Sequence, residues 1–256
     1  MKNFKTLPRC LKVVIISLII LIILCLVFIF LPTNIAVLGY HDFTNDVSSN
    51  DMQVTASKFD SEMQYLSNHH YQSLKLKDID CYLNHTCKLS KKSVLITMDD
   101  GWKNELLIAA PILKKYNLNA VIFYIGSNYD GHNSNFMDAN DLKTLTNDYP
   151  NIEIASHSYD LHHENDYLKS YDDLNNDFKN MESIIDSKYF AYPYGFYNSN
   201  YEQVLKDNNY QLAFTFGPGK LHRKIKSNDN IYEVPRLNIS NSMSLTKFEL
   251  RLLLPF

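Results

Sequence analysis

Glycine and proline are scarce in this sequence of 256 residues, with seven and eight copies, respectively. That scarcity excludes collagen-like and low-complexity chains, and an apolar content of 45% excludes an intrinsically disordered one. Basic residues are not in excess either, since 25 of them stand against 28 acidic residues. A nucleic-acid-binding protein needs a basic face for phosphate contacts, so we expect no nucleic-acid partner. The length allows one full-sized domain or two small ones.

Charge is distributed unevenly along the chain. The first 32 residues contain no acidic residue and four basic ones: Lys2, Lys5, Arg9 and Lys12. Residues 13–31 are 19 uncharged, mostly apolar residues, and as a helix they would extend about 28 Å, enough for a hydrocarbon core of roughly 30 Å. We therefore expect a basic cytoplasmic tip at 1–12, an uncleaved transmembrane anchor at 13–31 and an extracellular domain at 33–256. A cleaved signal peptide, which would leave a secreted domain, is the alternative.

Two of the four cysteines, Cys81 and Cys87, fall in the expected exterior domain. Outside the cytosol this pair could close a small disulfide across a loop, and two free thiols are the alternative. No CxxC spacing occurs in the sequence, so nothing indicates a zinc–cysteine site.

Short apolar runs alternate with segments of helical periodicity through the exterior domain, and no repeat or low-complexity linker interrupts them. Seven runs suit buried parallel strands: residues 35–40, 94–98, 120–125, 152–155, 189–192, 212–216 and 231–234. Helical spacing of apolar residues occurs in three of the intervening segments: 55–66, 102–116 and 171–185. Thr55 could cap the first of these helices. This alternation predicts one α/β domain, an incomplete or distorted (β/α) barrel of about seven parallel strands.

Residues that could act as acids, bases or metal ligands follow three of these runs. Asp99 and Asp100 follow the run at 94–98. Two adjacent carboxylates repel each other unless a cation or hydrogen bonds stabilise them. An acidic N-cap of the next helix is the alternative. His41 follows the first run, and His157 and His162 follow the fourth.

Imidazole is the commonest protein ligand for zinc and related metals. The five-residue spacing of His157 and His162 suits a loop, His163 could replace His162, and a solvated histidine-rich loop is the alternative. Because the carboxyl ends of parallel strands share one edge of a sheet, an aspartate and two histidines would meet there. Three such ligands leave coordination positions open, which predicts a catalytic metal site.

The fifth run ends in Tyr-Pro-Tyr-Gly at 192–195, a turn that would present the Tyr194 N–H to a ligand. Tyr192, Tyr194 and Trp102 would add aromatic faces to the same pocket, and such faces bind sugars well.

These residues resemble the motifs of the polysaccharide deacetylases of the NodB-homology, carbohydrate esterase family 4 type. Thr-Met-Asp-Asp at 97–100 resembles the family's Thr-Phe-Asp-Asp, the histidines of 157–162 resemble its His-Ser/Thr…His metal motif, and 192–195 resembles its Pro-Tyr-Gly motif. Leu-Gly-Tyr-His at 38–41 is most similar to the branch that deacetylates poly-β-1,6-N-acetylglucosamine, in which the motif order is permuted.

The resemblance implies a role for each matching residue. Asp99 would be the general base and His41 the general acid; the metal ligands would be Asp100, His157 and His162. Zinc is the default metal for such a site, and cobalt, nickel or iron also suits it. The arginine that most of the family places just before the Pro-Tyr-Gly turn is missing, and Arg236 is a candidate to supply its charge to the base.

The resemblance further implies an enzyme that hydrolyses N-acetyl groups of poly-β-1,6-N-acetylglucosamine in the biofilm matrix, with the polysaccharide synthase machinery as a further partner. Peptidoglycan or chitooligosaccharide is an alternative substrate, because the motifs determine the reaction better than the glycan linkage. A non-catalytic carbohydrate-binding surface protein is the alternative from another class, although a binder has no need of an acid and a base.

Overall fold

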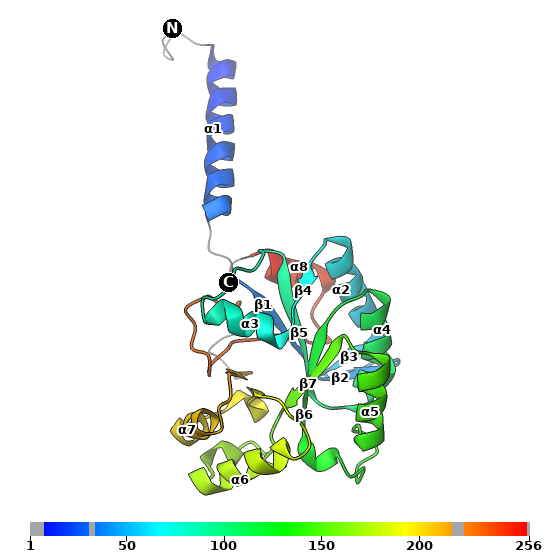
Figure 1. Cartoon of the computed structure of the whole chain (residues 1–256). Helices are drawn as coiled ribbons and strands as arrows, with labels where there is room; N and C mark the ends of the chain where they lie inside the picture. Colours follow the sequence, from blue (N-terminus) through cyan, green and yellow to red (C-terminus); the bar gives the residue numbers. More distant parts are fainter. Residues whose placement is uncertain (1–7, 31–33, 217–222, 255–256) are drawn as a thin grey trace. The chain divides into compact units, whose positions relative to one another are not determined.

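The computed structural model describes residues 8–30, 34–216 and 223–254, with the backbone alone described at 23–30. The chain divides into two units, Met1–Thr33 and Asn34–Phe256, and each is considered by itself. In the first, α1 (Arg9–Phe30) is helical (Figure 1). The expected cytoplasmic tip and anchor lie partly outside the described residues. Over the described residues, no helix is long and apolar enough to cross a membrane.

The second unit alternates strands with helices. The strands are β1 (Ala36–Tyr40), β2 (Asp42–Thr44), β3 (Gln53–Thr55), β4 (Gln72–Ser73), β5 (Ser93–Asp100), β6 (Ala120–Tyr124), β7 (Ile152–Ser156), β8 (Tyr189–Ala191), β9 (Leu212–Phe214) and β10 (Leu237–Asn238). The α-helices are α2 (Ala56–Asn68), α3 (Leu76–Leu83), α4 (Ala110–Lys115), α5 (Ala139–Asp148), α6 (Tyr171–Glu182), α7 (Ser199–Asp207) and α8 (Leu245–Leu253). Short turns of other helix types are η2 (Glu105–Ala109, π-helical) and the 3₁₀ turns η3 (Gly126–Asn128), η4 (Asp166–Leu168) and η5 (Pro193–Gly195).

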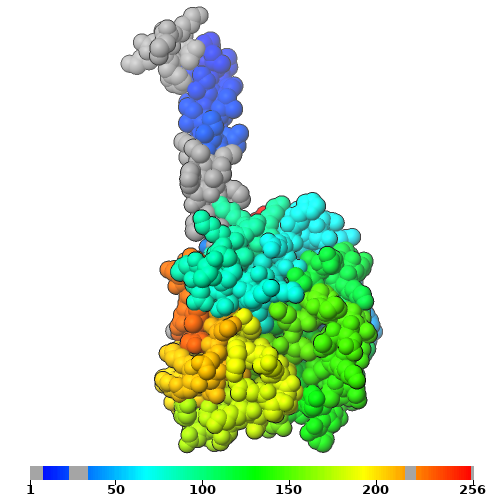
Figure 2. Space-filling view, viewed as in Figure 1, coloured from blue at the N-terminus to red at the C-terminus, as the bar shows by residue number. Residues whose placement is uncertain are grey.

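Parallel pairing joins seven strands in the order β10-β1-β5-β6-β7-β8-β9, and β4 adds to β5. Within the described residues β9 and β10 stand at opposite ends of this order, so the barrel is open. This half-barrel confirms the predicted incomplete (β/α) barrel of about seven parallel strands. Helices α2, α4 and α5 lie along one flank of the sheet, and α6 packs against α7 away from them (Figure 1). The yellow and orange part of the surface in Figure 2 includes α7.

In the part of the chain that the structure describes, buried apolar side chains form three clusters. The third lies between β8, β9, α6 and α7, and alternating side chains of the other strands contribute to the first two, on the two faces of the sheet. Leu38, Ile96 and Ile122 pack with apolar residues of α2, α4, α5 and α8 on the outer face. Leu95 and Val121 belong to the second cluster, inside the half-barrel. Strands buried on both faces explain why the sequence shows continuous apolar runs here rather than alternation.

Two predicted elements differ from the structure. Residues 231–234 do not form a strand, since Val234 makes only an isolated bridge to Phe214, and the seventh strand is β10, which pairs with β1 instead. The helix expected at 102–116 begins as the π-helical turn η2 before continuing as α4. By contrast, α2 begins at its predicted cap, where the Thr55 side chain accepts a hydrogen bond from the Lys58 N–H.

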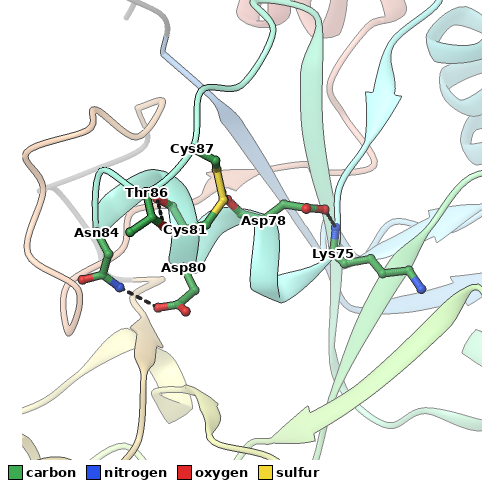
Figure 3. Close-up of a disulfide and its surroundings, with 7 residues drawn as sticks. All are labelled: Lys75, Asp78, Asp80, Cys81, Asn84, Thr86 and Cys87. Atoms are coloured by element: carbon green, nitrogen blue, oxygen red, sulfur yellow. Dashed lines mark hydrogen bonds between the residues drawn. A yellow bond between two sulfur atoms is a disulfide. The ribbon is translucent and has the colours of Figure 1, made fainter.

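The structure pairs Cys81 with Cys87 in a disulfide (Figure 3). The bridge closes the turn after α3, where the Thr86 hydroxyl also donates to the Cys81 carbonyl oxygen and the Asn84 amide donates to Asp80. Of the two alternatives that the sequence leaves open, the structure has the disulfide. Neither cysteine lines the cavity described below.

Candidate active site

The strand register brings the predicted polar residues to one edge of the sheet. Tyr40 lies opposite Met98, Asp100 opposite Tyr124, and Tyr124 opposite Ser156. The residues that follow these strand ends therefore meet, although more than a hundred positions separate the first from the last in sequence. They surround a cavity of about 550 Å³, a size typical of small-molecule sites.

Three residues at this edge have positive φ angles: Asp100 (84°), Ser158 (72°) and Tyr194 (57°). Residues other than glycine rarely adopt this region, and each instance costs of order 1–3 kcal/mol. The strain occurs where the chain leaves β5, β7 and β8, so each of these loops turns sharply as it reaches the cavity. Such strain accumulates at functional sites because the surrounding fold holds it in place.

Asp100 lies between two histidines. Its Oδ1 is 3.4 Å from Nε2 of His157 and 3.1 Å from Nε2 of His162. Its Oδ2 accepts a hydrogen bond of 3.0 Å from the Trp102 indole N–H. Burial alone would raise the pKa of Asp100, but hydrogen bonds from both imidazoles outweigh it and hold the pKa well below the ordinary value.

This trio fits a divalent cation. One ligand atom from each of Asp100, His157 and His162 lies within 4.8 Å of the others. The Nδ1 of His157 is 2.8 Å from the Ala191 carbonyl oxygen, which can only accept, so Nδ1 carries a proton. In the neutral imidazole, Nε2 then has the lone pair that can bind a metal. One carboxylate and two imidazoles form a donor set suited to zinc and to later first-row metals.

Asp99 lies beside the trio and binds Arg236. Nη1 and Nη2 of Arg236 donate to the two carboxylate oxygens at 2.6 and 2.8 Å, and Arg236 Nε donates to the Thr215 carbonyl oxygen at 3.2 Å. Both side chains are almost fully buried. Burial would raise the pKa of Asp99, but the Arg236 guanidinium, followed by His157 and His41, lowers it below the ordinary value. Arg236 thus lies where it can supply a positive charge to Asp99, as the sequence analysis suggested.

His41 also lies near Asp99, with its Nε2 3.9 Å from Asp99 Oδ2. Its ring meets the ring of Phe216 edge-on at 4.8 Å between centroids. Burial lowers the pKa of His41 below its ordinary value, although Asp99 and Asp100 act to raise it. A histidine whose pKa is adjusted by neighbouring acids and burial suits proton transfer.

Two predicted residues do not reach the cavity. The Tyr192 side chain is fully buried, donates its hydroxyl to the Tyr232 carbonyl oxygen and stacks on Tyr197, so it belongs to the core rather than to a substrate surface. This corrects its assignment as a substrate contact. The histidine offered as an alternative ligand, His163, is 86% exposed and faces Asp166. Tyr194, in contrast, is 47% exposed and lines the cavity with Trp102.

Several cavity-lining residues were not found from the sequence: Asp42, Asn50, Met52, Ile125, Phe136 and Phe216. Apart from Asp42, which directly follows His41, none is of a residue type that signals chemistry. Phe136 reaches the cavity because its backbone pairs with that of Trp102. Its ring stacks on the Trp102 indole, 4.2 Å between centroids. The only available signal was proximity to loops that follow strand ends.

Comparison with known proteins identifies the family. Residues 87–213 match the polysaccharide deacetylase family. The Bacillus subtilis protein YxkH is 29% identical over 226 residues, which cover 85% of this chain and 75% of the relative. The poly-β-1,6-N-acetyl-D-glucosamine N-deacetylase of Staphylococcus epidermidis is 29% identical over 202 residues, 73% of this chain and 68% of the relative. Residues 87–213 are a polysaccharide deacetylase domain.

The fold agrees with this match. The solved structure of the Streptococcus pyogenes deacetylase PplD in complex with acetate superposes with a TM-score of 0.74 at 21% identity, covering 86% of this chain and 99% of that one. The family match and the relatives confirm the resemblance of the sequence to polysaccharide deacetylases, and the superposition shows a shared fold. Arg236 binds Asp99 from a segment far beyond the Pro-Tyr-Gly turn, as the sequence analysis suggested.

Proposed function

We propose that this chain is a metal-dependent hydrolase that removes N-acetyl groups from poly-β-1,6-N-acetyl-D-glucosamine at the cell surface. The observation that carries the proposal is the arrangement around one cavity of a carboxylate–imidazole trio, a carboxylate bound by arginine, and a histidine within 3.9 Å of that carboxylate. A binding protein requires none of these pairings, whereas amide hydrolysis requires an acid, a base and an electrophile.

Asp100, His157 and His162 would hold the cation, and zinc is our proposed metal, with cobalt, nickel or iron as alternatives that the donors accept. When bound, the metal supplies a Lewis acid that lowers the pKa of water and polarises a carbonyl group.

Asp99 would act as the general base. It takes a proton from the attacking water while a C–O bond forms at the acetamide carbonyl carbon. Arg236 keeps Asp99 ionised and fixes both carboxylate oxygens, so the base is charged and oriented before substrate arrives. Arg236 is therefore a positioning residue.

His41 would act as the general acid. It gives a proton to the amide nitrogen as the C–N bond breaks, because an unprotonated amine anion is a very poor leaving group. The products are acetate and a free amine on the sugar. The Tyr194 N–H, in the strained turn after β8, would donate to the oxyanion of the tetrahedral intermediate, and Trp102 and the exposed Tyr194 ring would contact the sugar.

Mutants of the paired carboxylates test the role assignment. Asp99→Asn should bind metal normally and release no acetate, whereas Asp100→Asn should lose both metal and activity. Metal content of the purified variants, measured by atomic emission, separates the two. Equal metal content in both variants would contradict the roles assigned here.

The substrate is proposed from the staphylococcal relative, whose name specifies poly-β-1,6-N-acetyl-D-glucosamine. Acetate release from this polymer should exceed release from peptidoglycan or chitooligosaccharides and should stop with a chelator. Preference for either alternative glycan would refute the proposed substrate but not the proposed deacetylation reaction. Metal and glycan binding without acetate release would favour a non-catalytic protein.

We further propose that residues 13–31 anchor the chain in the cell membrane with the domain outside, next to the synthase machinery that supplies the polymer. The run of 19 uncharged residues after four basic ones supports this proposal. Membrane fractionation of the intact chain, combined with protease treatment of whole cells, tests it. Recovery of the domain in the culture medium would indicate a cleaved signal instead.

A further inference from the structure

The two histidines of the trio are held in different ways. His157 directly follows β7, its backbone N–H donates to the Tyr124 carbonyl oxygen at 2.9 Å, and its Nδ1 is 2.8 Å from the Ala191 carbonyl oxygen. Strands on both sides of β7 therefore fix its position and ring orientation.

His162 lies outside the sheet, and its side chain is 24% exposed. Within the part of the chain that the structure describes, Asp100 is the only polar partner of its imidazole, and the neighbouring rings are His157 and Tyr194. Its backbone N–H donates to the Asp160 carbonyl oxygen. The position of His162 thus depends on the backbone immediately before it.

Asp177 of α6 holds that backbone. Its Oδ2 accepts the Tyr159 N–H at 2.9 Å, and its Oδ1 accepts the N–H groups of Asp160 and Leu161 at 2.9 and 3.2 Å. Three consecutive backbone donors therefore converge on one carboxylate. From the other side, the N–H groups of η3 bind the carbonyl oxygens of residues 158 and 159, so the loop is fixed between η3 and α6.

The position of Asp177 in its helix is not explained by packing. It is 6% exposed and lies among Leu174, Phe178 and Met181, the buried apolar side of α6. Burial raises the pKa of Asp177, and the three backbone N–H groups oppose that rise. A carboxylate is costly at such a position, and a helix that only had to pack would place an apolar residue here.

We propose that Asp177 is a positioning residue that sets His162 against Asp100 and His157 and thereby determines the metal affinity of the site. The inference rests on the proposed function, because it assumes that the trio binds a metal. Groups that orient metal ligands typically change the affinity by about 10–100-fold when they are lost. Only an acceptor with two oxygen atoms can take all three donors, because an asparagine amide would present an NH₂ group to one of them.

Metal affinity of the full-length chain tests this directly. Wild type, Asp177→Asn and Asp177→Ala are titrated with Zn²⁺ in competition with a chromophoric chelator, and the visible absorption of the Co²⁺ form reports coordination. Asp177→Ala should bind Zn²⁺ about 10–100-fold more weakly. Asp177→Asn should fall between it and wild type, because one oxygen can still serve Asp160 and Leu161. The control is Asp172→Asn, an exposed aspartate on the same helix, which should match wild type.

Circular dichroism and thermal unfolding of the metal-free proteins accompany each titration. If both Asp177 variants are folded and bind Zn²⁺ with wild-type affinity and an unchanged Co²⁺ spectrum, the inference is wrong, even if their melting temperatures fall. If Asp177→Ala does not fold, the affinity of Asp177→Asn decides alone. If the wild-type protein binds no metal, the proposed function itself is refuted. If it does bind metal, the comparison with the Asp177 variants tests the role of Asp177 alone.

Discussion

The buried ion pair between Arg236 and Asp99 makes a prediction about stability that needs neither metal nor substrate. The side chains are 0% and 2% exposed, and two hydrogen bonds of 2.6 and 2.8 Å join them. Arg236 also donates to the Thr215 carbonyl oxygen and lies over the Phe216 ring, 4.7 Å from its centroid. Water has little access to either partner, so loss of one leaves the other without compensation.

Arg236→Met retains much of the side-chain length and removes the charge. Removing one partner of a buried ion pair costs about 3–5 kcal/mol, because the remaining charge is buried and unpaired. That cost is a large part of the 5–15 kcal/mol that typically separates folded from unfolded domains. If the unpaired carboxylate is the cause, neutralising it as well should help. We expect Arg236→Met/Asp99→Asn to regain about 2 kcal/mol relative to Arg236→Met alone.

Urea denaturation of the chelator-treated proteins, followed by circular dichroism, gives the free energy of unfolding for each member of the cycle. The matched control is Arg223→Met. Arg223 also forms a bidentate pair, with Asp229, but the two side chains are 28% and 10% exposed. More exposed pairs contribute about 1 kcal/mol or less. The reasoning fails if Arg236→Met costs no more than Arg223→Met, or if the effects of the two substitutions at the site simply add.

Three further outcomes are expected. Burial, followed by Asp100 and Asp99, raises the pKa of Glu105 well above its ordinary value, so the folded chain keeps a proton that the unfolded chain releases above about pH 4. As pH rises, the free energy of unfolding of Glu105→Gln should therefore increase relative to wild type, by about 1.4 kcal/mol per pH unit, until the pKa of Glu105 in the folded state is reached. Urea titrations at several pH values measure this difference, and a difference that does not change with pH would contradict the prediction. Replacing Cys81 and Cys87 together by serine should cost about 2 kcal/mol in the same assay, because the six-residue separation closes a small loop, and unchanged stability would argue against the bridge. His41→Gln should bind Zn²⁺ normally but release no acetate, and a variant that still turns over would exclude His41 as the acid.

Much of the sheet was predictable because its strands are buried on both faces. Continuous apolar runs marked β1, β5, β6 and β7, and the rule that parallel strands end at one edge gathered the polar residues after them. Local chemistry also placed the cap of α2 at Thr55. These features depend on short stretches of sequence, which a single sequence contains in full.

Features that depend on tertiary pairing were not predictable. The apolar residues at 231–234 have the composition of a strand, but they form only a bridge, while β10 is two residues long and carries no periodic signal. Tyr192 and Tyr194 look equivalent in sequence, yet the positive φ of Tyr194 directs one toward the cavity and leaves the other in the core. Their different environments arise from the strained turn, not from residue type.

The position of Arg236 shows how a partner can be found without the expected motif. A carboxylate as deeply buried as Asp99 needs a cation nearby, and the chain after residue 33 contains only three arginines: Arg223, Arg236 and Arg251. Arg223 is engaged by Asp229, and Arg251 donates to the Asn238 carbonyl oxygen. In the sheet order β10-β1-β5, Arg236 lies immediately before β10, and only β1 separates β10 from β5, the strand that carries Asp99. The charge requirement is local to the site, so any neighbouring strand end can meet it, and sequence order need not be kept.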